Sequence, residues 1–230
     1  MLFRSDFEAV LQHVERAFPG QPVQVVGHSV GGFLVGLAPS CHRIARVFTM
    51  GAQYAYWKDY ARQQRWRLLL KWHLVMPALT AVLGYFPGKR LGWLEDTPKG
   101  VVRDWTARAP RFEDIWRTGP AALDTPARQT LVAQFAAVRA DILAVGLSDD
   151  EFGTEVAIRR LLAYFSHCRR VHLHLRPGAL GHARIGHFAF FHQRHQHDLW
   201  PLALEWLRHG RLPSAVPGEV LTLHPQAGPR

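Results

Sequence analysis

Apolar residues at helical spacing open the chain, and a short β-branched run follows them. Phe7, Val10, Leu11 and Val14 share one helical face, which predicts an amphipathic helix that ends at Pro19-Gly20. Residues 22–27 then predict a strand, residues 30–38 a second helix, and residues 44–49 another strand. The order helix, strand, tight turn, helix, strand indicates a right-handed parallel βαβ unit.

The hydrophobic pattern changes over residues 53–128, where no strand pattern is convincing. We interpret this segment as helices and loops inserted between strands. It holds six of the eight tryptophans, which lie among arginines, prolines and glycines: Trp57, Trp66, Trp72, Trp93, Trp105 and Trp116.

Alternation resumes with a buried strand at residues 142–147, a polar loop, and a helix face that contains Leu161 and Leu162. Residues 171–175 predict a further strand, and a helix follows near residues 199–207. Residues 210–230, rich in proline and glycine, are expected to form a loose tail. The pattern therefore predicts one α/β domain over residues 1–230, with a mostly parallel sheet of about four strands and a helical insertion.

Composition excludes few functions. The 230 residues are 48% hydrophobic and carry a formal net charge of +10, which favours anionic partners. Arginines are spread along the chain without a block of like charges or a nucleic-acid-binding motif, so we expect no specific nucleic-acid function. Cys41 and Cys168 form no CxxC pair, and the acidic N-terminus lacks a signal peptide, which together favour a cytoplasmic protein. The most apolar stretch, residues 68–86, is interrupted too often to span a bilayer.

The strongest chemical signal is Gly27-His28-Ser29-Val30-Gly31-Gly32, placed between a predicted strand and a predicted helix. That context is the one a nucleophile elbow requires, because the serine lies on a tight turn whose neighbours must lack side chains. The helix N-terminus favours the oxyanion that forms when the serine attacks. The Val30 backbone N–H is then expected to be one oxyanion-hole donor.

A serine nucleophile needs a base and an acid, in the chain order serine, acid, histidine. Asp149 and Asp150 directly follow a buried strand, and His187 lies in a glycine-flanked loop after the next strand. A solvated turn and a packed core histidine are the alternatives when each is taken alone. The three in order favour a triad of Ser29, Asp150 and His187, with Asp149 as the other candidate acid.

Four segments together resemble a group of predicted bacterial α/β hydrolases without a defined substrate. They are the elbow, Phe86-Pro87-Gly88-Lys89-Arg90-Leu91-Gly92, Leu147-Ser148-Asp149-Asp150-Glu151-Phe152, and Ile185-Gly186-His187-Phe188-Ala189-Phe190-Phe191. The resemblance covers nearly the whole chain and implies Ser29 as nucleophile, Asp150 as acid and His187 as base. It also implies that the tryptophan-rich segment is a cap. Asp150 is preferred because Asp150 to Thr154 aligns with an Asp-x-x-Val-Pro pattern of such hydrolases, with Thr154 placed to cap the next helix.

The chain departs from this group at its start. Hydrolases of this type have several strands before the elbow strand, together with the loop that gives the second oxyanion N–H. Here one helix precedes the elbow. We therefore expect an N-terminally truncated fold in which the elbow strand is an exposed edge. A true start upstream of Met1, or a partner that supplies the missing strands, are the alternatives.

Two other patterns suggest different chemistry. His192-x-x-His195-x-His197 and His172-x-His174 have plausible metal-ligand spacing, but His197 leaves the helical face of the other two, so we expect a solvated surface and no metal. Trp57, Trp66 and Trp72 alternate with lysines and arginines. They predict a cap helix over the pocket, with a helix on an anionic membrane surface as the alternative.

The sequence as a whole predicts a serine hydrolase of ester-like bonds that acts on a small-molecule acyl substrate without a cofactor. The alternative is a truncated, catalytically silent hydrolase-fold protein that serves as a binding module, at an anionic membrane surface or elsewhere.

Overall fold

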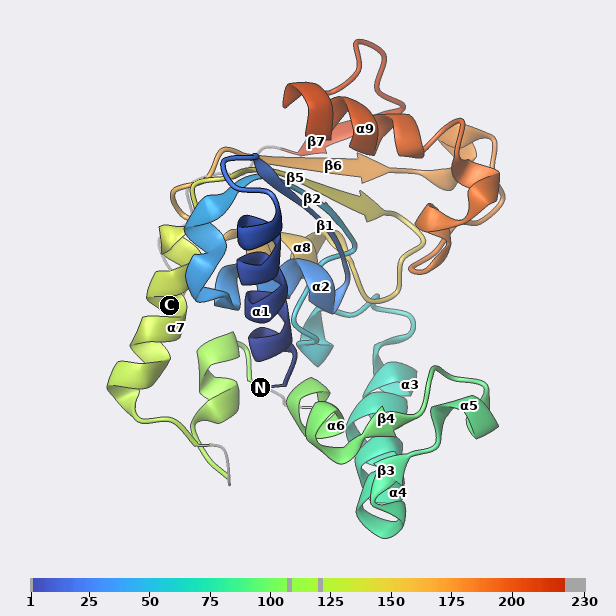
Figure 1. Ribbon diagram of the computed structural model, residues 1–230. Coiled ribbons are helices and arrows are strands. Elements are labelled where there is room, and N and C mark those ends of the chain that lie inside the picture. Colours follow the sequence, from blue (N-terminus) through green and yellow to red (C-terminus); the bar gives the residue numbers. More distant parts are fainter. Residues whose placement is uncertain (1, 107–108, 120–121, 222–230) are drawn as a thin grey trace.

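The computed structural model describes residues 2–106, 109–119 and 122–221. A five-stranded sheet forms its centre, in the order β1 (Val23–His28), β2 (Ile44–Met50), β5 (Asp141–Leu147), β6 (Arg170–Leu175) and β7 (Gly218–Leu221). The first four strands are parallel, and β7 runs antiparallel to β6 (Figure 1). The chain therefore has an α/β fold with a mostly parallel sheet, as the sequence predicts.

Helices cover both faces of this sheet, which is why the central strand β5 is apolar and buried from Ile142 to Leu147. One face packs against α1 (Leu2–Ala17), α2 (Val30–Leu34), α7 (Thr125–Ala137) and α8 (Glu155–Leu162), and the other against α9 (Trp200–His209) (Figure 1). Alternate residues of β5 separate the two cores: Ile142 and Ala144 belong to the first, Leu143 and Val145 to the second. This three-layer arrangement brings the carboxyl ends of the parallel strands to one edge of the sheet, where β2 lies between β1 and β5.

The insertion forms a separate lobe below the sheet in Figure 1. It consists of α3 (Arg65–Leu70), a π-helical turn (Lys71–Val75), α4 (Met76–Leu83), α5 (Gly88–Leu91) and α6 (Lys99–Trp105). The strands β3 (Tyr85–Phe86) and β4 (Thr97–Pro98) pair as a small antiparallel ribbon, which the sequence did not predict. Phe112 and Trp116, towards the end of the insertion, pack into the main core with α7 instead.

The prediction of about four strands followed by a loose tail over residues 210–230 needs correction. The sheet has a fifth strand, β7, inside the segment expected to be a loose tail, because Val220 and its neighbours pair with the edge of β6. That strand is four residues long and flanked by prolines and glycines, so its period is too short to detect. The remaining tail, residues 222–230, lies outside the described residues.

β1 forms one edge of the sheet, where the sequence places it. Within the described residues it pairs with β2 alone, and its Val26 side chain is 51% exposed. Among these same residues no helix is both long enough and apolar enough to cross a bilayer.

Candidate active site

Ser29 occupies the turn between β1 and α2 in a strained conformation. Its φ of 53° and ψ of −121° lie in a region that residues with side chains rarely adopt. The turn is held because the Ser29 N–H donates to the Met50 carbonyl at 3.0 Å. Strain of this kind persists only where the surroundings over-determine it, and it clusters at functional sites.

Close packing across the elbow explains two of its three glycines. A Cβ on Gly27 would lie 2.7 Å from the Gly32 Cα, and one on Gly32 would lie 2.5 Å from the Ala52 Cβ. A Cβ on Gly31 would meet nothing within 4 Å. Gly27 and Gly32 therefore allow strand and helix to approach, whereas the space around Gly31 imposes no such demand.

Asp150 and His187 form a buried pair at the carboxyl end of the sheet. Asp150 Oδ2 lies 2.7 Å from His187 Nδ1, and the two side chains are 0% and 5% exposed. Asp150 Oδ1 accepts hydrogen bonds from the backbone N–H groups of Phe152 and Gly153 at 2.8 and 2.7 Å. These donors fix the carboxylate, so that Oδ2 faces the imidazole. Thr154 caps α8 by accepting from the Ala157 N–H at 3.2 Å, as its position predicts.

Asp149 has a different task. Its Oδ2 accepts from the backbone N–H groups of Ile185 and Gly186, at 2.8 and 2.9 Å. It therefore anchors the loop that carries His187, and among the described residues no hydrogen bond joins Asp149 to the imidazole. Asp150 therefore orients the His187 ring, and Asp149 holds the backbone of the loop that carries it.

His28, which the sequence identified only as part of the elbow, holds the other side of that loop. Its Nε2 lies 2.7 Å from the His187 carbonyl oxygen, and since a carbonyl only accepts, Nε2 carries the proton. Burial, and then the neighbouring His187, lower the pKa of His28 and favour the neutral ring.

Gly51 makes room for the acid–base pair. Its φ is +57°, and a Cβ there would lie 2.7 Å from Asp150 Oδ2 and 3.1 Å from His187 Nδ1. Phe152 packs against His187 with ring centroids 5.2 Å apart. The sequence indicated neither role, since Gly51 lies outside the motifs, and Phe152, although within one, contacts His187 only in the folded chain.

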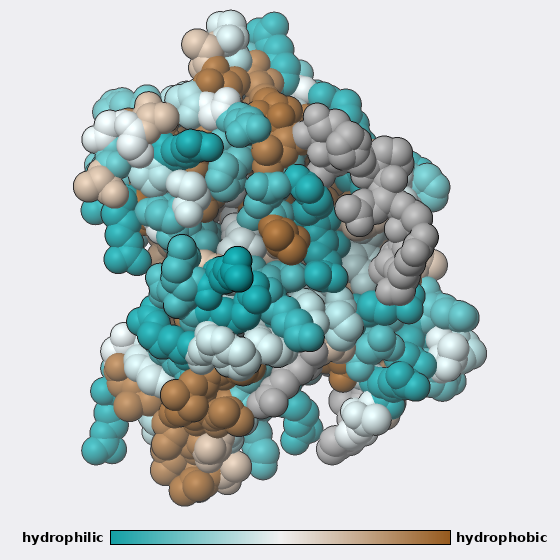
Figure 2. All heavy atoms as spheres, turned by 180° about the vertical axis from the view of Figure 1, so that it is seen from behind, coloured by the Kyte–Doolittle hydropathy of each residue, from teal (hydrophilic) through white to brown (hydrophobic). Residues whose placement is uncertain are grey.

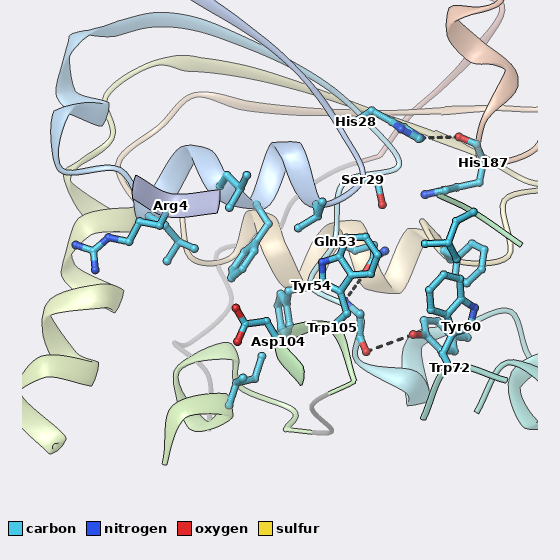
Figure 3. Close-up of a pocket in the computed structure, with 18 of the residues that line it drawn as sticks. Arg4, His28, Ser29, Gln53, Tyr54, Tyr60, Trp72, Asp104, Trp105 and His187 are labelled. Atoms are coloured by element: carbon cyan, nitrogen blue, oxygen red, sulfur yellow. Dashed lines mark hydrogen bonds between the residues drawn. The ribbon is translucent and has the colours of Figure 1, made fainter. Parts of the chain in front are cut away.

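Ser29 and His187 open onto the same cavity, which has a volume of about 290 Å³. Figure 3 shows the two side chains close together at one end, with Asp104 and Arg4 towards the other. Among the described residues no hydrogen bond joins Ser29 to His187. The walls between the two ends are mainly apolar: Phe33, Leu34, Leu37, Tyr54, Tyr60, Trp72, Trp105, Ile115, Trp116, Phe152 and Phe188.

The polar groups of the cavity are few and mostly paired. The Gln53 side-chain oxygen accepts from the N–H of Ala55, whose φ is 62°. Tyr60 Oη lies 3.3 Å from His73 Nε2, and burial raises the pKa of its phenol. Burial also raises the pKa of Asp104 at the far end. The cavity therefore suits a largely apolar molecule with one reactive polar group beside Ser29.

The folded chain thus brings Ser29, Asp150 and His187, all singled out in the sequence, to one edge of the sheet. Val30 begins α2 directly after the serine, so its N–H points out of the first helical turn. His172 and His174 lie elsewhere, on β6 beside Gly146. Within the described residues, the one close group of three metal-ligating side chains contains His195 but neither His192 nor His197.

No protein-family model matches the chain, and no curated protein matches it. Similar solved structures include a monoacylglycerol lipase from Paleococcus ferrophilus, with 14% identity and a TM-score of 0.47 over 89% of this chain and 74% of that one. An esterase domain from Rhodothermus marinus has 17% identity and a TM-score of 0.47 over 89% and 68%. A meta-cleavage product hydrolase from Pseudomonas fluorescens has 15% identity and a TM-score of 0.45 over 90% and 72%. At these identities and TM-scores the function has to be inferred from the geometry of the chain itself.

Proposed function

We propose that this chain is a serine hydrolase of ester-like bonds. The observation that carries the proposal is the buried Asp150–His187 pair, which opens onto the same apolar cavity as a strained serine. An acid, a base and a hydroxyl at one end of a cavity are the parts that acyl transfer needs.

In the proposed reaction Ser29 Oγ attacks the substrate carbonyl while His187 Nε2 takes the hydroxyl proton. Asp150 accepts from His187 Nδ1–H, which keeps Nε2 free as the base and stabilises the imidazolium that forms. The Val30 N–H donates to the oxyanion of the tetrahedral intermediate. His187 then returns the proton to the leaving alcohol, and water releases the acyl group by the same steps. No step uses a cofactor.

The cavity supports a small, largely apolar acyl substrate. Its volume of about 290 Å³ lies near the lower limit of small-molecule sites, about 300–1,000 Å³. Aromatic side chains line both the sheet and the cap side, so burial of an acyl or alcohol group supplies the binding energy.

The test is hydrolysis of a p-nitrophenyl ester series from acetate to decanoate. We expect Ser29→Ala and His187→Ala to lower kcat by at least about a thousandfold. Ser166→Ala and His209→Ala are matched controls, because both residues are exposed and distant in sequence from the motifs. Equal rates in the wild type and in Ser29→Ala would refute the proposal.

An exposed apolar surface favours a second candidate, in which the chain is a silent hydrolase-fold module that binds anionic membranes. The surface lies on the cap, where Figure 2 shows hydrophobic side chains gathered at the lower end of the molecule. Five of its members are between 49% and 83% exposed: Trp66, Leu70, Leu74, Val82 and Leu83. Arg62 lies exposed on the same segment, as does Arg67, which pairs with Glu151 at 3.1 Å. Together with the net charge of +10, Arg62 complements an anionic headgroup layer.

This candidate is tested by co-sedimentation with phosphatidylserine vesicles at low and high salt. We expect Leu70→Ser and Leu74→Ser to weaken binding, and Val156→Ser, which is 56% exposed on α8 outside the insertion, to leave it unchanged. Absence of binding at low salt would exclude the membrane role. Binding in a chain without esterase activity would favour this candidate over the first.

A further inference from the structure

The loop between β6 and α9 holds a cluster of three metal-ligating side chains that the proposed reaction does not use. His182 lies near the start of this loop, His195 lies near its end, and Asp198 stands just before α9. We propose that these three residues bind a divalent transition-metal ion, with Zn²⁺ as the ion that the ligand set fits best. This inference is independent of the proposed hydrolase function.

The ligand atoms are already gathered. One nitrogen from each histidine and a carboxylate oxygen of Asp198 all lie within 4.8 Å of one another. His182 Nε2 contacts Asp198 Oδ2, and His195 Nδ1 lies 3.6 Å from Asp198 Oδ1. Zinc ligands at about 2.0–2.2 Å from the ion stand roughly 3.5 Å apart in a tetrahedron. Small side-chain rotations therefore place all three around one ion, with water as the fourth ligand.

His195 provides the independent observation. Its side chain is 1% exposed, and its Nδ1 is buried without a hydrogen-bond partner while it faces the Asp198 carboxylate. An imidazole–carboxylate pair between His182 and Asp198 explains the first contact but leaves this nitrogen unsatisfied. Buried polar atoms are normally partnered, and a metal bond to Nδ1 supplies the missing partner.

Coordination also defines the proton on His195. His195 Nε2 lies 3.2 Å from Arg194 Nε, so without metal it accepts and Nδ1 carries the proton. A metal on Nδ1 requires that proton to move to Nε2, where it faces the arginine. Arg194 is exposed and turns away into solvent at little cost. Two neutral imidazoles and one carboxylate match the preference of Zn²⁺ for nitrogen and oxygen ligands.

An ion at this point closes the loop that presents His187. His182 and Asp198 flank the segment that contains Ile185, His187 and the buried Phe190. Asp149 already holds the loop at Ile185 and Gly186. The metal would join the two ends of this loop, through His182 and Asp198. We therefore expect the amides of residues 183–194 to exchange more slowly with deuterium when the metal is bound.

The experiment is Zn²⁺ binding to the chelator-stripped full chain, measured by competition with a chromophoric chelator. We expect one high-affinity site per chain. His182→Gln and Asp198→Asn, both at partly exposed positions, are expected to weaken it by at least about 100-fold. His197→Gln is the matched control, because this exposed neighbour lies outside the cluster. Co²⁺ bound to the wild type should show the strong visible absorption of a tetrahedral or five-coordinate site.

Circular dichroism of each variant separates loss of ligand from loss of fold, and Asp198→Asn keeps the shape of the side chain. Slower amide exchange over residues 183–194 in the presence of Zn²⁺ would further support a metal ion that joins the two ends of the loop. No stoichiometric Zn²⁺ on the folded wild type would overturn the proposal. So would binding that survives both His182→Gln and Asp198→Asn, because it would then come from other surface histidines.

Discussion

The two neighbouring aspartates are expected to fail in different ways when each is replaced. Asp149→Ala removes the acceptor of two backbone hydrogen bonds, from Ile185 and Gly186. Each bond to a charged acceptor contributes about 1.5–3 kcal/mol. Asp149 Oδ1 is buried without a partner, so its removal offsets part of the loss. The free energy of unfolding should therefore fall by roughly 2–4 kcal/mol, while the Asp150–His187 pair remains.

Asp150→Asn is expected to preserve the fold and stop the reaction. The N–H groups of Phe152 and Gly153 both point at Oδ1, so they select the amide oxygen of the asparagine for that position. The amide NH₂ then faces His187 Nδ1, which must accept, and the ring proton moves to Nε2. His187 can no longer act as the base in that tautomer. We expect kcat to fall on the order of 10⁴-fold.

Urea unfolding followed by tryptophan fluorescence gives the stability of both variants, and ester hydrolysis in the absence of urea gives kcat. Asp149→Ala should lower the urea midpoint yet retain measurable turnover. Asp150→Asn should keep the urea midpoint and lose turnover. The reasoning is refuted if Asp149→Ala abolishes turnover at unchanged stability, or if Asp150→Asn keeps its kcat.

Two further predictions concern stability. Burial lowers the pKa of His172 to about 4 in the folded chain, whereas the unfolded ring has a pKa of about 6.5. Below pH 6.5 the unfolded ring therefore binds a proton that the folded ring does not. The free energy of unfolding is at its full value above pH 6.5 and falls by about 3 kcal/mol as the pH drops to 4. Urea unfolding at pH 7.5 and 4.5 should show this loss, and His172→Leu should reduce it while the exposed control His209→Gln does not. Gly32→Ala should cost about 1–3 kcal/mol, because its Cβ would lie 2.5 Å from the Ala52 Cβ. Gly31→Ala should be tolerated, because a Cβ there would meet no atom within 4 Å. Thermal unfolding of both variants measures the difference, and equal melting temperatures for Gly32→Ala and Gly31→Ala would contradict the packing argument.

Much of the fold follows from local patterns in the sequence. The strands β1, β2, β5 and β6 all have β-branched or apolar runs bounded by turns, and each lies where the pattern places it. The sequence did not predict β7, because four residues are too few to show an alternating hydrophobic pattern. It did not predict the β3–β4 ribbon either, because each of its strands is two residues long.

The candidate site divides in the same way. Ser29, the Asp149–Asp150 pair and His187 carry local signals, since each follows a predicted strand in a polar or glycine-rich turn. The roles of His28 and Gly51 depend on contacts between distant segments, which no spacing encodes. The choice between Asp149 and Asp150 needed the direction of each carboxylate. Likewise the sequence grouped His195 with His192 and His197, whereas the loop brings it to His182 and Asp198.

The most direct test of the account is labelling of the folded 230-residue chain with a fluorophosphonate, with the modified residue located by peptide mass spectrometry. An activated serine loses its proton to His187, and its Oγ attacks phosphorus and expels fluoride, which leaves a covalent phosphonyl ester. We predict one adduct, on Ser29, that disappears in His187→Ala and persists in His209→Ala. No adduct on a folded chain, or an adduct on another serine, would contradict the account.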